Sequence, residues 1–189
     1  MRLFVAVEIP EPVRQEVRRR GEPLRGELPR ARWVDPGLLH LTLLFLGEVE
    51  RALQEALDEA LRRAFAGHPP IELGLEDAGG FPPGRPARVA WIGVSAPPTL
   101  AALQRSVAES ARAAVGSRPE EREFHPHLTL ARCDPPWGPA ALERFRRVFA
   151  GPVGERFVAA SGVLFESLLG PGGPRHAPLA EYPLQAREA

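Results

Sequence analysis

The tetrapeptide His-Leu-Thr-Leu occurs twice in this chain, beginning at His40 and at His127, and the similarity extends beyond these four residues. Residues 2–9 and the segment that starts at Arg88 are both short β-branched runs, followed by amphipathic stretches of helical spacing. The interval from the first run to the tetrapeptide is 40 − 2 = 38 residues in one part and 127 − 88 = 39 in the other. Such an internal repeat constrains the architecture more than any local pattern does.

Each part continues, after its tetrapeptide, with a second amphipathic segment and a further strand-like run. Helices are expected over 51–67 and 138–151, both ending in Ala-Gly, and strands over 71–79 and 157–167. Each part therefore reads β-α-β-α-β. The sequence predicts an α+β fold of two duplicated halves, related by a pseudo-two-fold axis, with a central cleft lined by strands of both halves.

The two halves, about 1–80 and 81–189, are expected to form one bilobal domain over 1–189. Half of a chain of this length buries too little of its sheet to be stable alone. Glycine and proline in the stretch GGFPPGRPA, residues 79–87, predict an irregular linker between the halves.

The composition restricts the class of partner. Hydrophobic residues make up 44% of the 189, which is enough for a packed interior. The 24 basic residues, all arginine, balance 24 acidic ones, so any binding of nucleic acid requires a local basic patch instead of a protein-wide positive field. Cys133 is the only cysteine, which excludes an internal disulfide. The sequence shows neither an apolar run of bilayer length nor a signal peptide, so we expect a cytoplasmic protein that does not contact membranes. We also expect the protein to be a monomer.

The repeated tetrapeptide places polar groups on one face of each strand. Side chains alternate along a strand, so His40 and Thr42 face one way and Leu41 the other. The same alternation applies to His127 and Thr129. If both strands line the cleft, two imidazoles, which titrate near pH ~6.5, and two hydroxyls converge there. Phosphodiester cleavage needs an acid and a base, and hydroxyls can donate hydrogen bonds to phosphate oxygens, so this scheme requires no metal ion and no cofactor.

Other interpretations of these residues stay open. A single His-x-Thr strand is usually half-buried, with its polar side chains facing water, and this applies to either copy alone. Two copies at equivalent places in a duplicated chain favour a function instead. His125 lies two residues before His127 on the same face, so a three-histidine zinc site that includes His40 is a further alternative.

Four stretches together carry a resemblance to a known family. They are RWVDPGLLHLTLLFLGEV (32–49), REFHPHLTLAR (122–132), the opening RLFVAVEIP and the late VLFESLLGPGGPRHAPLAEYPL (163–184). The chain resembles the bacterial 2'-5' RNA ligase family of the 2H phosphoesterases, whose hallmark is a pair of HxTx motifs. The resemblance implies a bilobal fold, RNA 2',3'-cyclic phosphodiesterase activity that leaves a 2'-phosphate, and the reverse, ATP-independent 2'-5' joining of RNA ends.

The same resemblance implies roles for single residues. His40 matches the proton donor and His127 the proton acceptor, while Thr42 and Thr129 hold the phosphate. The implied partner is RNA with 2',3'-cyclic phosphate ends, tRNA fragments among them. The apolar motif positions do not separate RNA from a small cyclic nucleotide as substrate, and a duplicated scaffold that only binds RNA or tRNA ends is the other alternative.

Two further side chains are candidate substrate contacts. Arg132 follows the second motif, as an arginine usually does in that family, and a guanidinium suits phosphate. Strand parity places it on the face opposite His127 unless a bulge intervenes. Phe4 could stack on a base, although a phenylalanine in a first strand also fits the core, and the same choice applies to Trp91.

Overall fold

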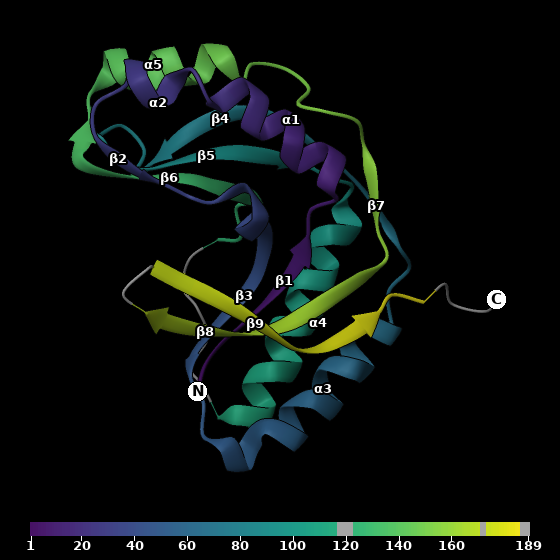
Figure 1. Ribbon diagram of the computed structural model, residues 1–189. Helices are drawn as coiled ribbons and strands as arrows, with labels where there is room; N and C mark the ends of the chain where they lie inside the picture. Colours follow the sequence, from purple (N-terminus) through teal and green to yellow (C-terminus); the bar gives the residue numbers. More distant parts are fainter. Residues whose placement is uncertain (117–122, 171–172, 186–189) are drawn as a thin grey trace.

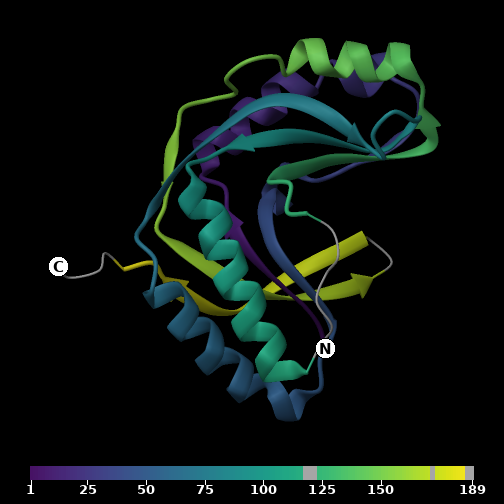
Figure 2. The same ribbon diagram turned by 180° about the vertical axis from the view of Figure 1, so that it is seen from behind.

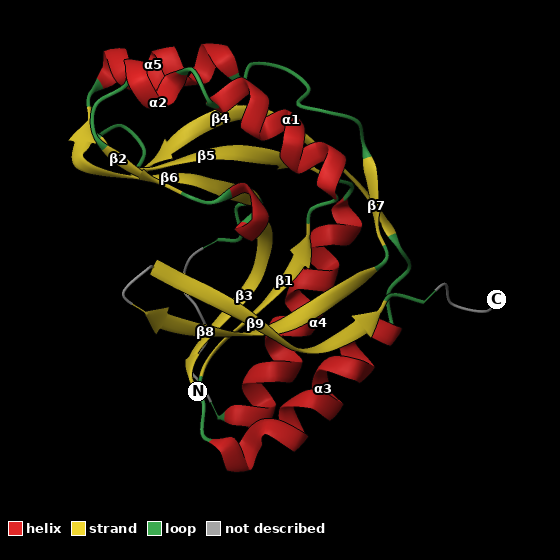
Figure 3. Cartoon of the chain, in the orientation of Figure 1, coloured by secondary structure: helices red, strands yellow, loops and turns green. Residues whose placement is uncertain are grey.

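The computed structural model describes residues 1–116, 123–170 and 173–185. Its strands are β1 (Arg2–Glu8), β2 (Ala31–Trp33), β3 (His40–Glu48), β4 (Ile71–Phe81), β5 (Ala87–Ser95), β6 (His127–Trp137), β7 (Phe157–Ala159), β8 (Ser161–Gly170) and β9 (Gly173–Pro183). Its helices are α1 (Glu11–Gly21), α2 (Leu24–Glu27), α3 (Gln54–Ala66), α4 (Pro98–Val115) and α5 (Pro139–Val148). The strands form two antiparallel sheets, one of order β3-β1-β8-β9 and one of order β2-β6-β5-β4-β7 (Figures 1 and 3).

The two halves of the chain exchange strands. In the four-stranded sheet, β1 of the first half lies between β3 of the same half and β8 of the second, and it pairs with both. In the five-stranded sheet, β5 of the second half lies between β6 of the same half and β4 of the first, and it pairs with both. Both sheets thus contain the same order of equivalent strands, β3-β1-β8 and β6-β5-β4. The predicted α+β fold with two lobes is confirmed, and each lobe is built from both halves.

The helices lie on the sides of the sheets that face away from each other. Helices α3 and α4 pack together and contact β9 and β3 of the four-stranded sheet (Figure 2). Helix α5 contacts β4 and β6 of the other sheet, where the ring of Phe145 lies 5.8 Å from that of Trp137. Helix α1 runs across the same sheet in Figure 1. Within the described ranges, no helix has the length and apolar character needed to cross a membrane.

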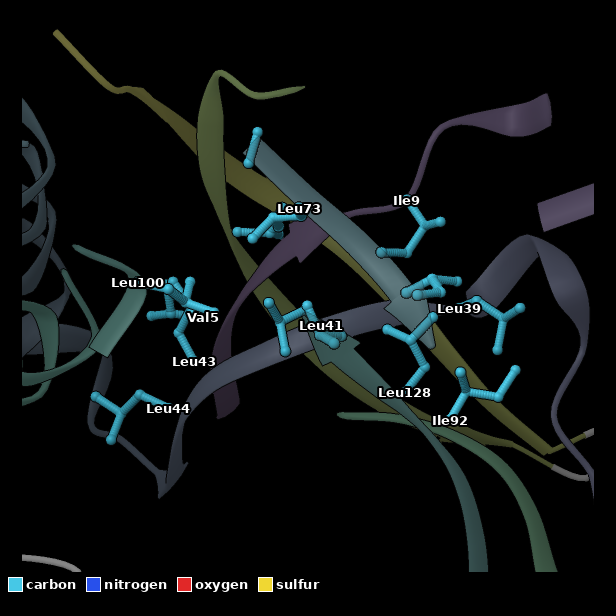
Figure 4. Packing of buried hydrophobic residues seen from close by; sticks show 14 of the residues in the cluster. Val5, Ile9, Leu39, Leu41, Leu43, Leu44, Leu73, Ile92, Leu100 and Leu128 are labelled. Atoms are coloured by element: carbon cyan, nitrogen blue, oxygen red, sulfur yellow. The ribbon is translucent and has the colours of Figure 1, made fainter. Parts of the chain in front are cut away.

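Buried side chains of both sheets belong to one contiguous hydrophobic cluster (Figure 4). Leu41 of β3 and Leu128 of β6 are fully buried in it, together with Leu73 and Ile92. A shared core of this kind ties the two lobes together, because neither sheet can leave it without exposing apolar surface. The leucines of the repeated tetrapeptide are therefore structural.

The predicted linker 79–87 is wrong at both ends, because β4 includes 79–81 and β5 begins at Ala87. Strand β4 continues to Phe81, so only 82–86 remain irregular between β4 and β5. Gly79 pairs with Trp91, and a Cβ at Gly79 would lie 2.2 Å from the indole Cζ2. Here the missing side chain lets the indole lie across the neighbouring strand, a close approach that is one use of glycine inside a sheet.

Strand β9 was not expected from the sequence, and α5 ends earlier than expected. Strand β9 contains Pro174, Pro178 and Pro183, which argue against a central strand, but it lies at the sheet edge, where proline is tolerated. Helix α5 ends at Val148, before the Ala-Gly pair, whereas α3 ends at Ala66 as expected.

Substitution of Gly162 tests the packing of α3 on the four-stranded sheet. A Cβ at Gly162 would lie 2.3 Å from two ring carbons of Phe65, which is fully buried and stacked on Tyr182. We expect Gly162→Ala to lower the free energy of unfolding by about 1–3 kcal/mol through overpacking, measured as a lower urea midpoint. The control is Gly26→Ala in α2, where a Cβ meets no atom within 4 Å. Equal midpoints for the two variants would contradict this account.

Candidate active site

The two tetrapeptides begin the strands that meet between the lobes. His40 and Thr42 are half-buried on one face of β3, and the intervening Leu41 is buried on the other. His127 and Thr129 are likewise half-buried on β6. Strands β3 and β6 contact each other although they belong to different sheets. The structure therefore places the two motif-bearing strands in contact, with the histidine and threonine of each on the face opposite its buried leucine, as the alternation of side chains predicts.

Each histidine is held by a backbone carbonyl two residues earlier in the chain. The Nδ1–H of His40 donates to the Leu38 carbonyl at 2.7 Å, and the Nδ1–H of His127 donates to the His125 carbonyl at 2.6 Å. A carbonyl only accepts, so Nδ1 carries the hydrogen in both rings. Both neutral imidazoles thus have Nε2 available to take up a proton.

The carbonyl that accepts the hydrogen bond of His40 belongs to a short turn whose residues favour turn formation. Asp35 accepts a hydrogen bond from the backbone N–H of Gly37 at 2.7 Å and starts the 3₁₀ turn Pro36–Leu38. Asp, Pro and Gly each favour a turn, by side-chain hydrogen bonding, fixed φ and conformational freedom respectively. This turn presents the Leu38 carbonyl to the ring of His40.

Burial lowers the proton affinity of both rings. The pKa of His40 is lowered to about 4, mainly by burial, with smaller contributions from the positive charges that His176 and His127 would carry; the bond to Leu38 opposes the shift. The pKa of His127 is lowered from about 6.5 by burial and, less, by the charge of His125. Both imidazoles are therefore neutral at pH 7 without a ligand, and they lie near enough for their charges to interact.

The hydroxyls of the two motif threonines do not take part in the hydrogen bonds that hold the described fold together. In the part of the chain that the structure describes, neither Thr42 nor Thr129 has a hydrogen-bond partner for its hydroxyl. Each lies two residues from a histidine on the same strand face. Two Nε2 atoms and two hydroxyls thus have no hydrogen-bond partner in the described part of the chain.

Aromatic rings of the four-stranded sheet surround His40. Its ring centroid lies 5.0 Å from that of Phe4 and 6.5 Å from that of Phe165. Phe4 is only 3% exposed and is stacked on Phe165 at 5.2 Å. This burial favours a packing role for Phe4 over stacking on a nucleobase. The structure adds His176 of β9, whose ring lies 5.1 Å from that of His40. The sequence did not place His176 near His40, because strand β9 was not expected.

A similar set surrounds His127. Phe81 of β4 lies 5.1 Å from its ring, Trp91 of β5 6.2 Å and His125 6.0 Å. Trp91 is half-buried, and its ring also contacts that of His125 at 4.7 Å. Each candidate catalytic imidazole is therefore flanked by aromatic rings of its own sheet, and His127 also by the ring of His125 in the preceding loop. These neighbours restrict the rotation of both imidazoles.

A β-bulge re-aims Arg132. Trp91 pairs with Thr129 but Ala90 pairs with Ala131, so Leu130 is an extra residue in β6. A bulge shifts the alternation of faces by one residue. Arg132 is accordingly exposed between buried neighbours, on the same face as Thr129. Simple strand parity places Arg132 on the other face, and the bulge is the physical reason that it lies on this one.

Strand β3 contains the corresponding bulge. Ala6 pairs with Thr42 and Val5 with Leu44, so Leu43 is the extra residue. This bulge places Phe45 on the face of His40, where its ring lies 5.9 Å from that of Phe4 and it is 64% exposed. Equivalent bulges thus present an arginine in one lobe and a phenylalanine in the other.

Among the described residues, neither a metal-binding cluster nor the surface hollow beside α3 includes the histidines of the two motifs. Within the described residues, no three His, Cys, Asp or Glu side chains are placed to hold one metal ion. A hollow of about 560 Å³ lies between α3 and the sheet, lined by Asp58, Arg62 and Leu164 among others. Leu164 belongs to the core side of β8, so this hollow lies on the helix side of the sheet. The converging polar groups therefore define the candidate site.

Comparison with solved structures supports the fold at full length. The crystal structure of TT0787 of Thermus thermophilus aligns with a TM-score of 0.80 and 28% identity over 100% of both chains. The crystal structure of E. coli LigT in apo form aligns with a TM-score of 0.77 and 31% identity over 98% of both chains.

Sequence relatives point the same way. The RNA 2',3'-cyclic phosphodiesterase of Archaeoglobus fulgidus is 35% identical over 183 residues, which are 96% of this chain and 99% of that protein. The enzyme of the same name from Methanothermobacter thermautotrophicus is 36% identical over 136 residues, 72% of this chain and 73% of that one. The pattern of the 2'-5' RNA ligase superfamily matches residues 10–153. The chain therefore belongs to the 2'-5' RNA ligase superfamily, the family that its paired motifs resemble.

Proposed function

We propose that the protein hydrolyses RNA 2',3'-cyclic phosphate ends to 2'-phosphates by two-histidine acid–base catalysis, in the cytoplasm and as a monomer. The observation that carries the proposal is the matched pair of Nδ1–carbonyl hydrogen bonds, which leave an Nε2 on each of two meeting strands. The names of the relatives supply the substrate class, an RNA cyclic phosphate. RNA fragments that carry such ends, tRNA pieces included, are the substrates.

The proposed reaction gives the two imidazoles different roles. Nε2 of His127 takes a proton from the attacking water as the water oxygen bonds to phosphorus. The bond from phosphorus to the 3' oxygen breaks, and Nε2–H of His40 gives its proton to that oxygen, so the phosphate stays on the 2' oxygen. The resemblance assigns the donor and acceptor roles. Hydroxyls of Thr42 and Thr129 donate hydrogen bonds to the non-bridging oxygens, where negative charge is concentrated.

The low pKa of His40 makes its proton depend on the substrate. In the ligand-free protein, the ring is neutral at pH 7 because burial disfavours its charged form. The negative charge of a bound cyclic phosphate favours the protonated ring and raises this pKa. The acid is thus charged mainly when the phosphate is present.

The same groups support joining of RNA ends. A 5'-hydroxyl of a second RNA in the position of the water gives a 2'-5' linkage, and the strained cyclic ester supplies the driving force without ATP. The reverse reaction, cleavage of that linkage, exchanges the roles of the two imidazoles by microscopic reversibility.

Replacement of either central histidine tests the proposed chemistry. We expect His40→Gln and His127→Gln to lower kcat by about 10²- to 10⁴-fold on an oligonucleotide that ends in a 2',3'-cyclic phosphate, with a smaller change in KM. Turnover is measured with EDTA and without ATP, and the product end is identified as a 2'- or 3'-phosphate. His68→Gln, in the loop between α3 and β4, is the matched control. Tight binding of the oligonucleotide by the wild-type protein without turnover would identify an RNA-end-binding module instead.

The pH dependence tests the protonation states. The productive free protein has one ring protonated and one neutral, and this state is most populated between the two pKa values, both lowered by burial. We expect kcat/KM to peak below pH ~6.5 and to fall toward pH 8, and kcat to peak at higher pH because bound phosphate raises both pKa values. NMR titration of the ring of His40 should show a midpoint of about 4. A value of kcat/KM that rises steadily from pH 6 to pH 8 would contradict these states.

A further inference from the structure

The two lobes differ at the residue that lies opposite each motif threonine. In the five-stranded sheet, Trp91 of β5 pairs in register with Thr129. In the four-stranded sheet, Ala6 of β1 holds the same position opposite Thr42. Residues directly opposite in an antiparallel pair share a face, with Cβ atoms about 5 Å apart. One lobe therefore places an indole beside its motif threonine, on the face of the candidate active site, where the other lobe has a buried methyl group.

The indole lies flat across the neighbouring strand. Gly79 of β4 pairs with Trp91, and a Cβ at Gly79 would lie within 2.8 Å of the indole atoms Cζ2, Cη2 and Cε2. The benzene half of the indole thus covers this glycine. Trp91 is only half-buried, so part of its surface stays accessible. A flat ring that is held against a sheet and is partly accessible can stack on a nucleobase of any identity.

Two further rings border the indole and connect it to the candidate base. Phe81 of β4 lies 5.4 Å from the ring of Trp91 and 5.1 Å from that of His127. His125, which is exposed, lies edge-on to the indole at 4.7 Å. Its ring nitrogens form no hydrogen bond with the described residues, so they can meet the polar edge of a base. The three rings together form a platform beside His127.

The stereochemistry of the proposed reaction places the attacking group over this platform. In a displacement at phosphorus, the attacking and leaving oxygens lie roughly in line on opposite sides of the phosphorus atom. His40 protonates the leaving 3' oxygen, so the ribose of the cyclic end lies toward the four-stranded sheet. His127 takes the proton of the attacking hydroxyl, so that hydroxyl approaches from the five-stranded sheet, to which Trp91 belongs. When the hydroxyl is the 5' end of an RNA, its own nucleoside also lies over this sheet.

We propose that Trp91, bordered by Phe81 and His125, binds the nucleobase of the RNA whose 5'-hydroxyl attacks the cyclic phosphate. This inference rests on the proposed function and deepens it, because it gives the joining reaction a binding site of its own. In that reaction the 5' oxygen bonds to phosphorus and its proton passes to Nε2 of His127. The bond from phosphorus to the 3' oxygen breaks, and that oxygen takes the proton of His40. Water, which has no base, makes no use of the platform in hydrolysis.

The partition between joining and hydrolysis tests the proposed site. An oligonucleotide that ends in a 2',3'-cyclic phosphate is incubated with an excess of a 5'-hydroxyl oligonucleotide whose first residue carries either adenine or no base. Initial rates of the 2'-5'-joined and the 2'-phosphate products are measured. For the wild-type protein, we expect the ratio of joining to hydrolysis to be at least about tenfold higher with adenine than with the abasic residue. Trp91→Leu should abolish this difference, and Trp91→Phe, which keeps a flat ring, should retain part of it.

The ratio of the two products does not depend on the amount of active protein, because water and the 5'-hydroxyl attack the same cyclic end. Phe45→Leu removes a ring that is 64% exposed in the other lobe, and we expect this control to leave the ratio unchanged. Equal ratios for the two acceptors with the wild-type protein would overturn the inference. So would a loss in Trp91→Leu that is as large for hydrolysis as for joining, because the indole would then serve the cyclic end or His127.

A binding assay separates this inference from the proposed function. Fluorescence anisotropy compares two labelled oligonucleotides with a 2'-5' linkage, one with adenine and one without a base on the 5'-oxygen side of that linkage. A 3'-deoxyribose on the other side prevents cleavage. The wild-type protein should bind the adenine ligand about tenfold more tightly, and Trp91→Leu should bind both equally. If the wild-type protein does not discriminate, the inference fails even if cyclic phosphates are hydrolysed. If it discriminates but turns over no cyclic phosphate, the proposed function fails and the binding site for the base stands.

Discussion

Two buried leucines hold the candidate site in place. Leu41 and Leu128 are fully buried, one in each sheet, and each is flanked along its strand by the histidine and threonine of its motif. Because strand side chains alternate, burial of the leucine fixes the direction of both polar neighbours. A one-residue slip of either strand would turn the imidazole into the core. The hydrophobic burial that packs the two lobes together therefore also determines which way the imidazoles point.

The two lobes share the same backbone geometry at the motif strands but differ in the side chains that this geometry presents. Each motif-bearing strand has an extra residue just after its threonine, Leu43 in β3 and Leu130 in β6. The carbonyl of each extra residue accepts a hydrogen bond from a third segment of the chain, Leu43 from the side chain of Gln104 and Leu130 from the backbone N–H of Val34. The side chain that follows each bulge differs between the lobes, an exposed phenylalanine at 45 and an arginine at 132. The paired histidine and threonine are the same in both lobes, whereas the side chains that follow the two bulges differ.

Local patterns in the sequence predict the strands and helices, whereas the pairing of strands that are distant in the chain is not predicted. Alternation in HLTL and the β-α-β-α-β order predicted both the polar faces and the two-lobed fold. The exchange of β4 and β8 between lobes depends on pairings distant in sequence, which no local pattern records. The same holds for the bulge that re-aims Arg132 and for His176, which reaches His40 from a proline-containing edge strand. A glycine-rich stretch at Gly79 was misinterpreted as a linker because its covering indole lies on another strand.

The exchange of strands also determines how the molecule can deform. The chain crosses between the lobes repeatedly in its described part, at 9–10, 34–39, 67–70, 96–97 and Ala160. Two bodies joined by one short segment can swing about it as a hinge, but bodies joined by this many crossings, and by a common core, resist such rotation. The fold itself thus sets the spacing between the two imidazoles, so a ligand that contacts both would require little reorganisation of the protein.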